Sequence, residues 1–252
     1  MSKMTPTQPM PEHFPLDSLG PLLARYKPPG GQFAPAAAWT QTYGVYTLAG
    51  RSPAGGGRRV GRVELKRAVG SKGAAALHVR YDRSLTGGAH RTAGTIHTRA
   101  DDTLNQPRTW TFQTQLLDAG GKPILHTRQS KTGTFADGVV QIKDAAGTKR
   151  HKVPGRCLMN WALFDTVQRL AGEKTEPIAF TLIDHFDQVK GGYTLSCRKT
   201  LGVAVGGRTI RLRAYDQLGR GNVPWVYWVD EQGRLLLIVA GLEAYMLEAS
   251  GQ

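Results

Sequence analysis

Residues 157–172 read CLMNWALFDTVQRLAG, and their large apolar residues recur at the spacing of a helix. Met159, Leu163, Val167 and Leu170 follow one another at intervals of three and four, and a glycine stands where a helix commonly ends. Two aromatic residues between them widen the apolar stripe beyond one face. The pattern predicts one main helix, over about 157–171, that is buried on more than one side.

On both sides of this segment the dominant period is two, which is typical of half-buried strands. Residues 75–81 and 109–116 give the clearest alternation. The same reading predicts further strands at 40–49, 59–69, 91–98, 139–143, 178–183, 193–199, 209–215, 225–229, 235–239 and 243–248. We therefore expect a large antiparallel sheet.

Turn signals between these segments favour hairpins joined in a meander. Asp-x-x-Gly recurs at 118–121, 144–147, 216–219 and 230–233, where Asp caps a type I turn and Gly supplies a positive φ. Residues 205–208, Val-Gly-Gly-Arg, predict a tighter two-residue turn. The expected fold class is α+β and β-dominated: a twisted antiparallel half-barrel wrapped around the one main helix.

Proline use suggests how the chain is organised. Eight of the 14 prolines fall within residues 1–38, which we interpret as an extended leader with one short helix near residues 16–26. Residues 39–252 are expected to form a single half-barrel domain.

Composition narrows the class of protein. The chain has 252 residues, 40% of them hydrophobic, and no apolar run approaches the roughly 18 residues of a transmembrane helix. No secretory signal is visible, so we expect the periplasm or cell envelope if a leader has been removed, and the cytoplasm otherwise. Cys157 and Cys197 lie 40 residues apart without a CxxC spacing. They are expected to be free thiols, with a single bridge left open.

A formal charge of +14 makes a polyanion or an anionic membrane surface a plausible partner. The excess is uneven, with eleven basic and two acidic residues between positions 51 and 100. Basic side chains at alternate positions would share one face of a strand. The residues that could form such a polyanion-binding face are Arg58, Arg59, Arg62, Lys66, Arg211 and Arg213. The alternative reading of the same residues is a solvated sheet face.

No catalytic, nucleotide-binding or metal-binding motif is present, which favours a non-enzymatic protein with no cofactor and no metal. The only compact titratable group is Asp184-His185-Phe186-Asp187. On a strand His185 and Asp187 would share one face, so an acid/base pair is one hypothesis and a solvated turn is the other.

The carboxyl-terminal region carries apolar side chains on both faces of one predicted hairpin, in residues 225–228 and 235–239. The helix can cover one face. The other face either packs as core or lines a cavity for an apolar ligand.

The order of these features resembles a known group of proteins. Trp110 and Phe112 on long strands precede the 161–164 helix motif WALF, the 180–184 strand FTLID and the closing hairpin YWVDEQGRLL at 227–236. This order resembles uncharacterised bacterial envelope proteins of the LolA-like and LppX-like half-barrel superfamily, over residues 39–249. The resemblance implies an antiparallel half-barrel closed by helix, in proteins that are usually exported and that sometimes hold acyl chains in the concave face.

The leading hypothesis is a non-enzymatic, envelope-associated protein that binds a lipid or another apolar ligand in the concave face of the half-barrel. The expected lining residues are Trp161, Phe180, Trp225, Tyr227 and Trp228. The alternative is a basic module that binds nucleic acid or another polyanion through the six basic residues named above. The oligomeric state stays open.

Overall fold

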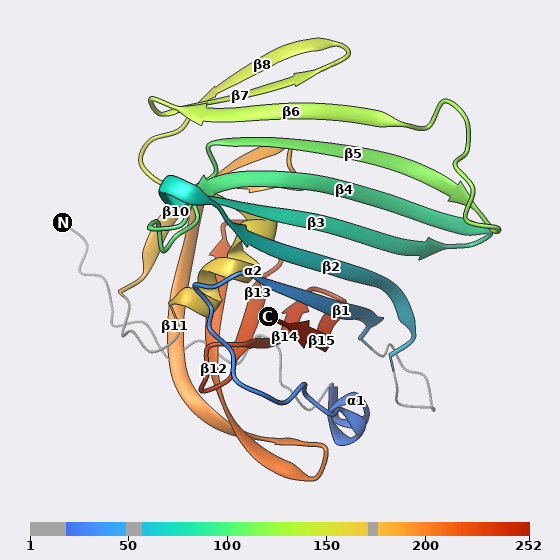
Figure 1. Cartoon of the computed structure of the whole chain (residues 1–252), viewed down its shortest axis with the longest axis vertical. Helices are drawn as coiled ribbons and strands as arrows, with labels where there is room; N and C mark the ends of the chain where they lie inside the picture. Colours follow the sequence, from blue (N-terminus) through green and yellow to red (C-terminus); the bar gives the residue numbers. More distant parts are fainter. Residues whose placement is uncertain (1–18, 49–56, 171–175) are drawn as a thin grey trace.

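The computed structural model of the chain describes residues 19–48, 57–170 and 176–252, and these form one large sheet around a central helix (Figure 1). The helices are α1 (Gly20–Arg25) and α2 (Asn160–Arg169). The strands are β1 (Trp39–Thr47), β2 (Arg59–Val69), β3 (Ala74–Leu85), β4 (Gly88–Arg99), β5 (Thr109–Asp118), β6 (Gln129–Ala136), β7 (Val139–Asp144), β8 (Gly147–Lys152), β9 (Cys157–Met159), β10 (Ile178–Asp184), β11 (Gln188–Val205), β12 (Arg208–Gly219), β13 (Trp225–Val229), β14 (Leu235–Ala240) and β15 (Glu243–Gly251).

The sheet consists of two meanders joined by one long-range strand pair. Its strand order is β8-β7-β6-β5-β4-β3-β2-β1-β15-β14-β13-β12-β11-β10-β9, so β1 pairs with the last strand, β15. All neighbours are antiparallel except β9 and β10. Strands β8 and β9 are consecutive in the chain but form the two ends of the sheet. The sheet is therefore open, and the predicted β-dominated half-barrel class is confirmed.

Helix α2 fills the concave side of the sheet (Figure 1). Every residue from Asn160 to Gln168 is buried. The Phe164 ring meets the rings of Tyr43, Tyr227 and Tyr245 edge-on, at centroid distances of 5.5–6.1 Å. Edge-to-face contacts stabilise aromatic pairs beyond the area that they bury. The helix thus joins strands from both halves of the sheet into one core.

The helix is shorter than the sequence predicted. It begins at Asn160, because residues 157–159 form β9 and pair in parallel with Thr181, Leu182 and Ile183. These three residues are buried on both faces, so their sequence has no strand alternation. The glycine at position 172, the predicted C-cap, lies outside the described residues.

Three of the four predicted Asp-x-x-Gly turns are present, and one prediction was wrong. Residues 118–121, 144–147 and 230–233 form turns, and Gly206 and Gly207 adopt positive φ in the β11–β12 turn. Residues 216–219 instead lie inside β12, where Asp216 pairs across the sheet with Val226 and Ser196. The buried Asp216 side chain forms an ion pair there with the partly buried Arg198 on β11.

The described part of the proline-rich leader lies against the domain. Leu19, Leu23 and Phe33 are buried in the common core. The short helix predicted near residues 16–26 is seen as α1, at Gly20–Arg25. None of the described helices is long and apolar enough to cross a membrane.

Candidate functional site

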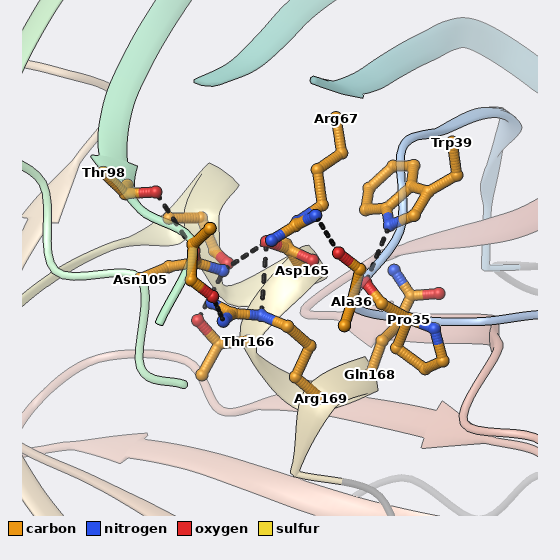
Figure 2. A network of polar contacts seen from close by, with 12 residues as sticks. Pro35, Ala36, Trp39, Arg67, Thr98, Asn105, Asp165, Thr166, Gln168 and Arg169 are labelled. Atoms are coloured by element: carbon orange, nitrogen blue, oxygen red, sulfur yellow. Dashed lines mark hydrogen bonds and ion pairs between the residues drawn. The ribbon is translucent and has the colours of Figure 1, made fainter. Parts of the chain in front are cut away.

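A buried group of charged side chains lies at the carboxyl-terminal end of α2 (Figure 2). Asp165 accepts a hydrogen bond from Arg67 Nε at 3.1 Å through its Oδ2 atom. The same oxygen accepts one from Asn105 Nδ2 and lies 3.5 Å from Arg169 Nε. The side chains of Arg67, Asp165 and Arg169 are only 1%, 3% and 7% exposed. Two guanidinium groups therefore share one carboxylate, and the group carries a formal charge of +1.

Local sequence explains how Asn105 reaches the helix. The Asp102 carboxylate accepts hydrogen bonds from the backbone N–H groups of Leu104 and Gln106, which folds the β4–β5 connection into a compact turn. Asn105 sits there at φ 53°, a conformation that asparagine tolerates better than most residues. Thr166 on α2 donates to the Leu104 carbonyl at 2.9 Å. The connection is thus fixed to the last turns of the helix.

The segment before β1, which we call the N-terminal strap (residues 26–38), covers the other side of this group. Arg67 Nη1 donates to the carbonyls of Ala36 and Ala37. Arg234, which is also buried, donates to the carbonyls of Pro29, Gly30 and Gly31 and lies over the Phe33 ring. Two buried arginines therefore fix the strap through its backbone carbonyls.

A cavity of about 650 Å³ opens beside the group. Its walls come from five parts of the chain: the strap, the β4–β5 connection, the end of α2, the β11–β12 pair and the β13–β14 turn. The residues that line it are Pro35, Ala36, Ala100, Asp101, Thr103, Gln168, Arg169, Thr200, Arg211, Arg213, Val229, Asp230, Glu231, Gln232 and Gly233. This volume suits a small organic molecule.

Three cations and three carboxylates line this cavity, but the carboxylates have partners of their own. Asp101 is paired with Arg99, and Glu231 lies 3.4 Å from Arg211. Asp230 accepts two backbone N–H groups of its own turn. Within the described part of the chain, Arg213 has no carboxylate within ion-pairing distance. Arg213 is therefore a lining guanidinium without an ion-pair partner among the described residues, whereas Arg169 shares the Asp165 carboxylate with Arg67.

Burial changes the titration of the groups in and beside the cavity. It raises the pKa of Asp165, against the opposing effect of the two guanidinium groups, and it lowers the pKa of Arg169. It also raises the pKa of Asp230. Among the described residues, Arg169 Nη2, Arg67 Nη2 and Asp165 Oδ1 have no hydrogen-bond partner. Charged groups with unused hydrogen-bonding capacity favour a bound counter-ion nearby.

The five aromatic residues predicted to line an apolar site lie mostly inside the core. Trp161, Tyr227 and Trp228 are 2% exposed or less. Trp225 stacks on Tyr245 and lines a pocket of about 200 Å³. Phe180 lines a groove of about 850 Å³ beside β8, together with Arg150 and Arg156. The structure does not bring the five together around one cavity, because α2 occupies the concave face.

The six predicted basic residues fall into two groups. Four lie at or near β2, where Arg59 pairs with Glu248 at 2.7 Å and Arg62 lies 3.6 Å from Glu64. Arg58 and Lys66 are exposed there. Acidic neighbours thus offset part of the charge of this face. The other two, Arg211 and Arg213, lie on β12 and line the cavity at the end of α2.

The Asp184–Asp187 segment forms a turn that inserts an aromatic ring into the core. His185 and Phe186 both adopt positive φ, and Phe186 is fully buried against Phe112 at a centroid distance of 4.9 Å. Asp187 pairs with Lys131, whereas His185 is exposed and lies 3.7 Å from Asp184. A turn, and not a strand, carries these residues, so the turn interpretation agrees with the structure and the hypothesis of a His185–Asp187 pair does not.

The two cysteines and the possible metal ligands can be compared with the sequence-based expectations. Cys157 and Cys197 are both free. Within the described residues, no cluster of three or more histidine, cysteine or acidic side chains is arranged to hold a metal ion.

Sequence reasoning missed Arg67 and Arg169, the two cations that share Asp165. A signal existed for Arg67, because it follows Val63 and Leu65 at the inward positions of β2. A charged residue in the apolar phase of a strand must find a buried partner. The predicted helix contained Arg169, but nothing local indicated that β2 and the strap would meet its last turn.

Comparisons with known proteins support the architecture alone. No protein-family model matches the chain, and no curated protein matches it. A crystal structure of a β-barrel-like protein of the domain of unknown function DUF1849 from Brucella abortus is similar, with a TM-score of 0.57 and 10% identity. The match covers 85% of this chain and 97% of that one. This likeness shows a β-barrel-like fold, and the LolA-like resemblance remains a prediction.

Proposed function

We propose that this chain is a binding protein that takes a small organic anion into the cavity at the carboxyl-terminal end of α2. The observation that carries the proposal is that Arg67 and Arg169 share one buried carboxylate, Asp165, and so leave positive charge beside the cavity. Arg213, on the wall formed by β12, adds a guanidinium that has no carboxylate within ion-pairing distance among the described residues.

The chemistry of the walls favours a carboxylate, sulfonate or phosphate. Guanidinium groups donate paired hydrogen bonds to planar or tetrahedral oxyanions, and they do so more strongly where water is scarce. Thr103 and Thr200 add hydroxyl groups, while Pro35, Ala36 and Val229 supply apolar contact. We therefore expect a ligand with one anionic group on an apolar body.

Two sequence-based predictions stay untested: that the protein binds a lipid in its concave face, and that it is located in the cell envelope. A ligand in the concave face would have to displace α2, which itself carries Trp161 and packs its Phe164 ring against Tyr227. Binding at the end of α2 needs no such rearrangement, which is why we place the ligand there.

The test uses 8-anilinonaphthalene-1-sulfonate as the probe, because it joins a permanent anion to an aromatic body. Arg213→Gln should weaken its binding about tenfold or more, as expected for a lost hydrogen bond to a charged group. Arg62→Gln, the same change on the outer face of β2, is the matched control and should leave the affinity unchanged. Equal affinities in all three proteins would exclude the cavity as the site.

A further inference from the structure

A cluster of exposed apolar side chains lies far from the cavity, at one end of the sheet. Eight large apolar residues in the described part of the chain are exposed. The pairing of Gly88 with Leu85 and with Asp118 brings the β3–β4 turn beside the end of β5, where the β5–β6 loop begins (Figure 1). Four of the eight belong to these segments: Leu85, Leu116, Ile124 and Leu125. Leu125 is the most exposed of all, at 82%. Apolar residues gathered in this way usually mark a contact surface.

The β5–β6 loop (residues 119–128) is held in place by hydrogen bonds, so the exposure is not a result of missing structure. Asp118 Oδ1 accepts the Lys122 backbone N–H at 2.8 Å, and the Asp118 N–H donates to the Lys122 carbonyl. The Ile124 N–H donates to the Leu116 carbonyl at 2.9 Å. Thr127 Oγ1 donates to the Ile124 carbonyl and accepts the Leu116 N–H. The loop thus presents Ile124 and Leu125 outward on a fixed backbone.

Two cations flank the apolar pair. Lys122 and Arg128 stand on either side of it, and neither forms an ion pair with any described residue. Arg128 donates to the Gln113 side chain at 2.9 Å. Asp118, the acidic residue that precedes the loop, accepts the Lys122 backbone N–H with its carboxylate. Apolar side chains between uncompensated cations match an anionic lipid surface, whose phosphates attract the cations while its acyl region takes up the apolar groups.

We propose that the β5–β6 loop docks the protein onto an anionic membrane surface, with Leu125 and Ile124 entering the interface and Lys122 and Arg128 on the headgroups. This site is separate from the anion-binding cavity, and it does not depend on the proposed function.

A second exposed leucine provides a matched control. Leu242 is 81% exposed in the β14–β15 turn. Its neighbour is acidic, Glu243, which pairs with Arg83 at 2.6 Å. The two leucines therefore differ in the charge beside them and not in their exposure.

The experiment measures co-sedimentation of the full chain with vesicles of phosphatidylcholine, alone or with about one-third phosphatidylglycerol. Binding should require phosphatidylglycerol. Leu125→Ser should weaken it about tenfold, the effect of removing one buried leucine side chain, whereas Leu242→Ser should not change it. Lys122→Gln should also weaken it.

Three results would overturn the proposal. They are no binding to either vesicle, equal losses in the two serine variants, and binding that is insensitive to Leu125→Ser. The last result would assign the attraction to the general +14 charge of the chain. Because both leucines are exposed, the circular-dichroism spectra of the Leu125→Ser and Leu242→Ser variants should match that of the unchanged protein.

Discussion

Arg67 on β2 and Asp165 on α2 lie 98 residues apart in the chain and form a buried ion pair, with Nε 3.1 Å from Oδ2. The same guanidinium donates to two carbonyls of the strap. One side chain thereby connects the sheet, the central helix and the segment that forms a wall of the cavity. Removing one member of such a buried group is costly because the polar groups that it satisfied lose their hydrogen bonds without gaining contact with water.

We predict that Arg67→Met lowers the free energy of unfolding by about 3–5 kcal/mol, because Asp165 loses one of its two hydrogen-bond donors and two buried strap carbonyls lose the Arg67 donor. Urea denaturation followed by circular dichroism measures this change. Arg62→Met, which alters an outward-facing residue of the same strand, should cost no more than about 0.5 kcal/mol. Comparable losses in both variants would show that the buried pair has no special role.

The pH dependence of stability should contain a contribution from Asp230. Burial raises its pKa in the folded protein above the value in the unfolded chain. The stabilising contribution is then complete below about pH 4 and is lost as the pH rises through the raised pKa.

Asp230→Asn mimics the protonated side chain. We expect this variant and the unchanged protein to have similar stability near pH 4, and the variant to be the more stable one at pH 7. Urea titrations at the two pH values measure this. A variant that loses stability as the pH rises, relative to the unchanged protein, would contradict the sign.

The two cysteines should differ in reactivity. Burial raises the pKa of Cys157 to about 12, so its thiol stays protonated at pH 8 in the folded protein. Cys197 is only partly buried, although burial also raises its pKa. Alkylation with iodoacetamide, read by mass spectrometry, should label Cys197 slowly and leave Cys157 unlabelled until denaturant is added. Early labelling of Cys157 would indicate that β9 is accessible.

The turn after β10 should be structural. Phe186→Ala should reduce stability by about 3–5 kcal/mol, because the ring packs between Phe112 and Trp161 in the core. His185→Ala, at the neighbouring exposed position, should change stability by no more than about 0.5 kcal/mol. Thermal or urea unfolding compares the stabilities of the two variants. A larger loss of stability in His185→Ala than in Phe186→Ala would contradict the structural role of the Phe186 ring.

The sequence predicted much of the fold because alternation and helical spacing are local signals. Residues 59–69 and 225–229 were predicted with the same bounds that β2 and β13 have. The missed elements lack such signals. Strand β9 is buried on both faces, and β8 is exposed almost throughout. The Asp-x-x-Gly spacing at 216–219 predicts a turn, and no local signal reveals that Asp216 pairs across the sheet with Arg198, 18 residues away.

The candidate site was only partly predictable, because no single segment encodes it. Arg211 and Arg213 were identified as neighbours on one face of a strand, and both line the cavity. They were expected to bind a polyanion on an open sheet face. The strap and the end of α2 complete the cavity beside that face, and nothing local in the β12 sequence indicates that these segments meet there.

Diffraction from crystals grown with 4-bromobenzenesulfonate tests the central claim most directly, because the bromine locates the probe by its anomalous signal. The account predicts a bromine peak in the cavity at the end of α2, with the sulfonate oxygens in hydrogen-bond contact with Arg169 or Arg213. A peak confined to another part of the molecule, with no ordered probe in this cavity, would contradict it.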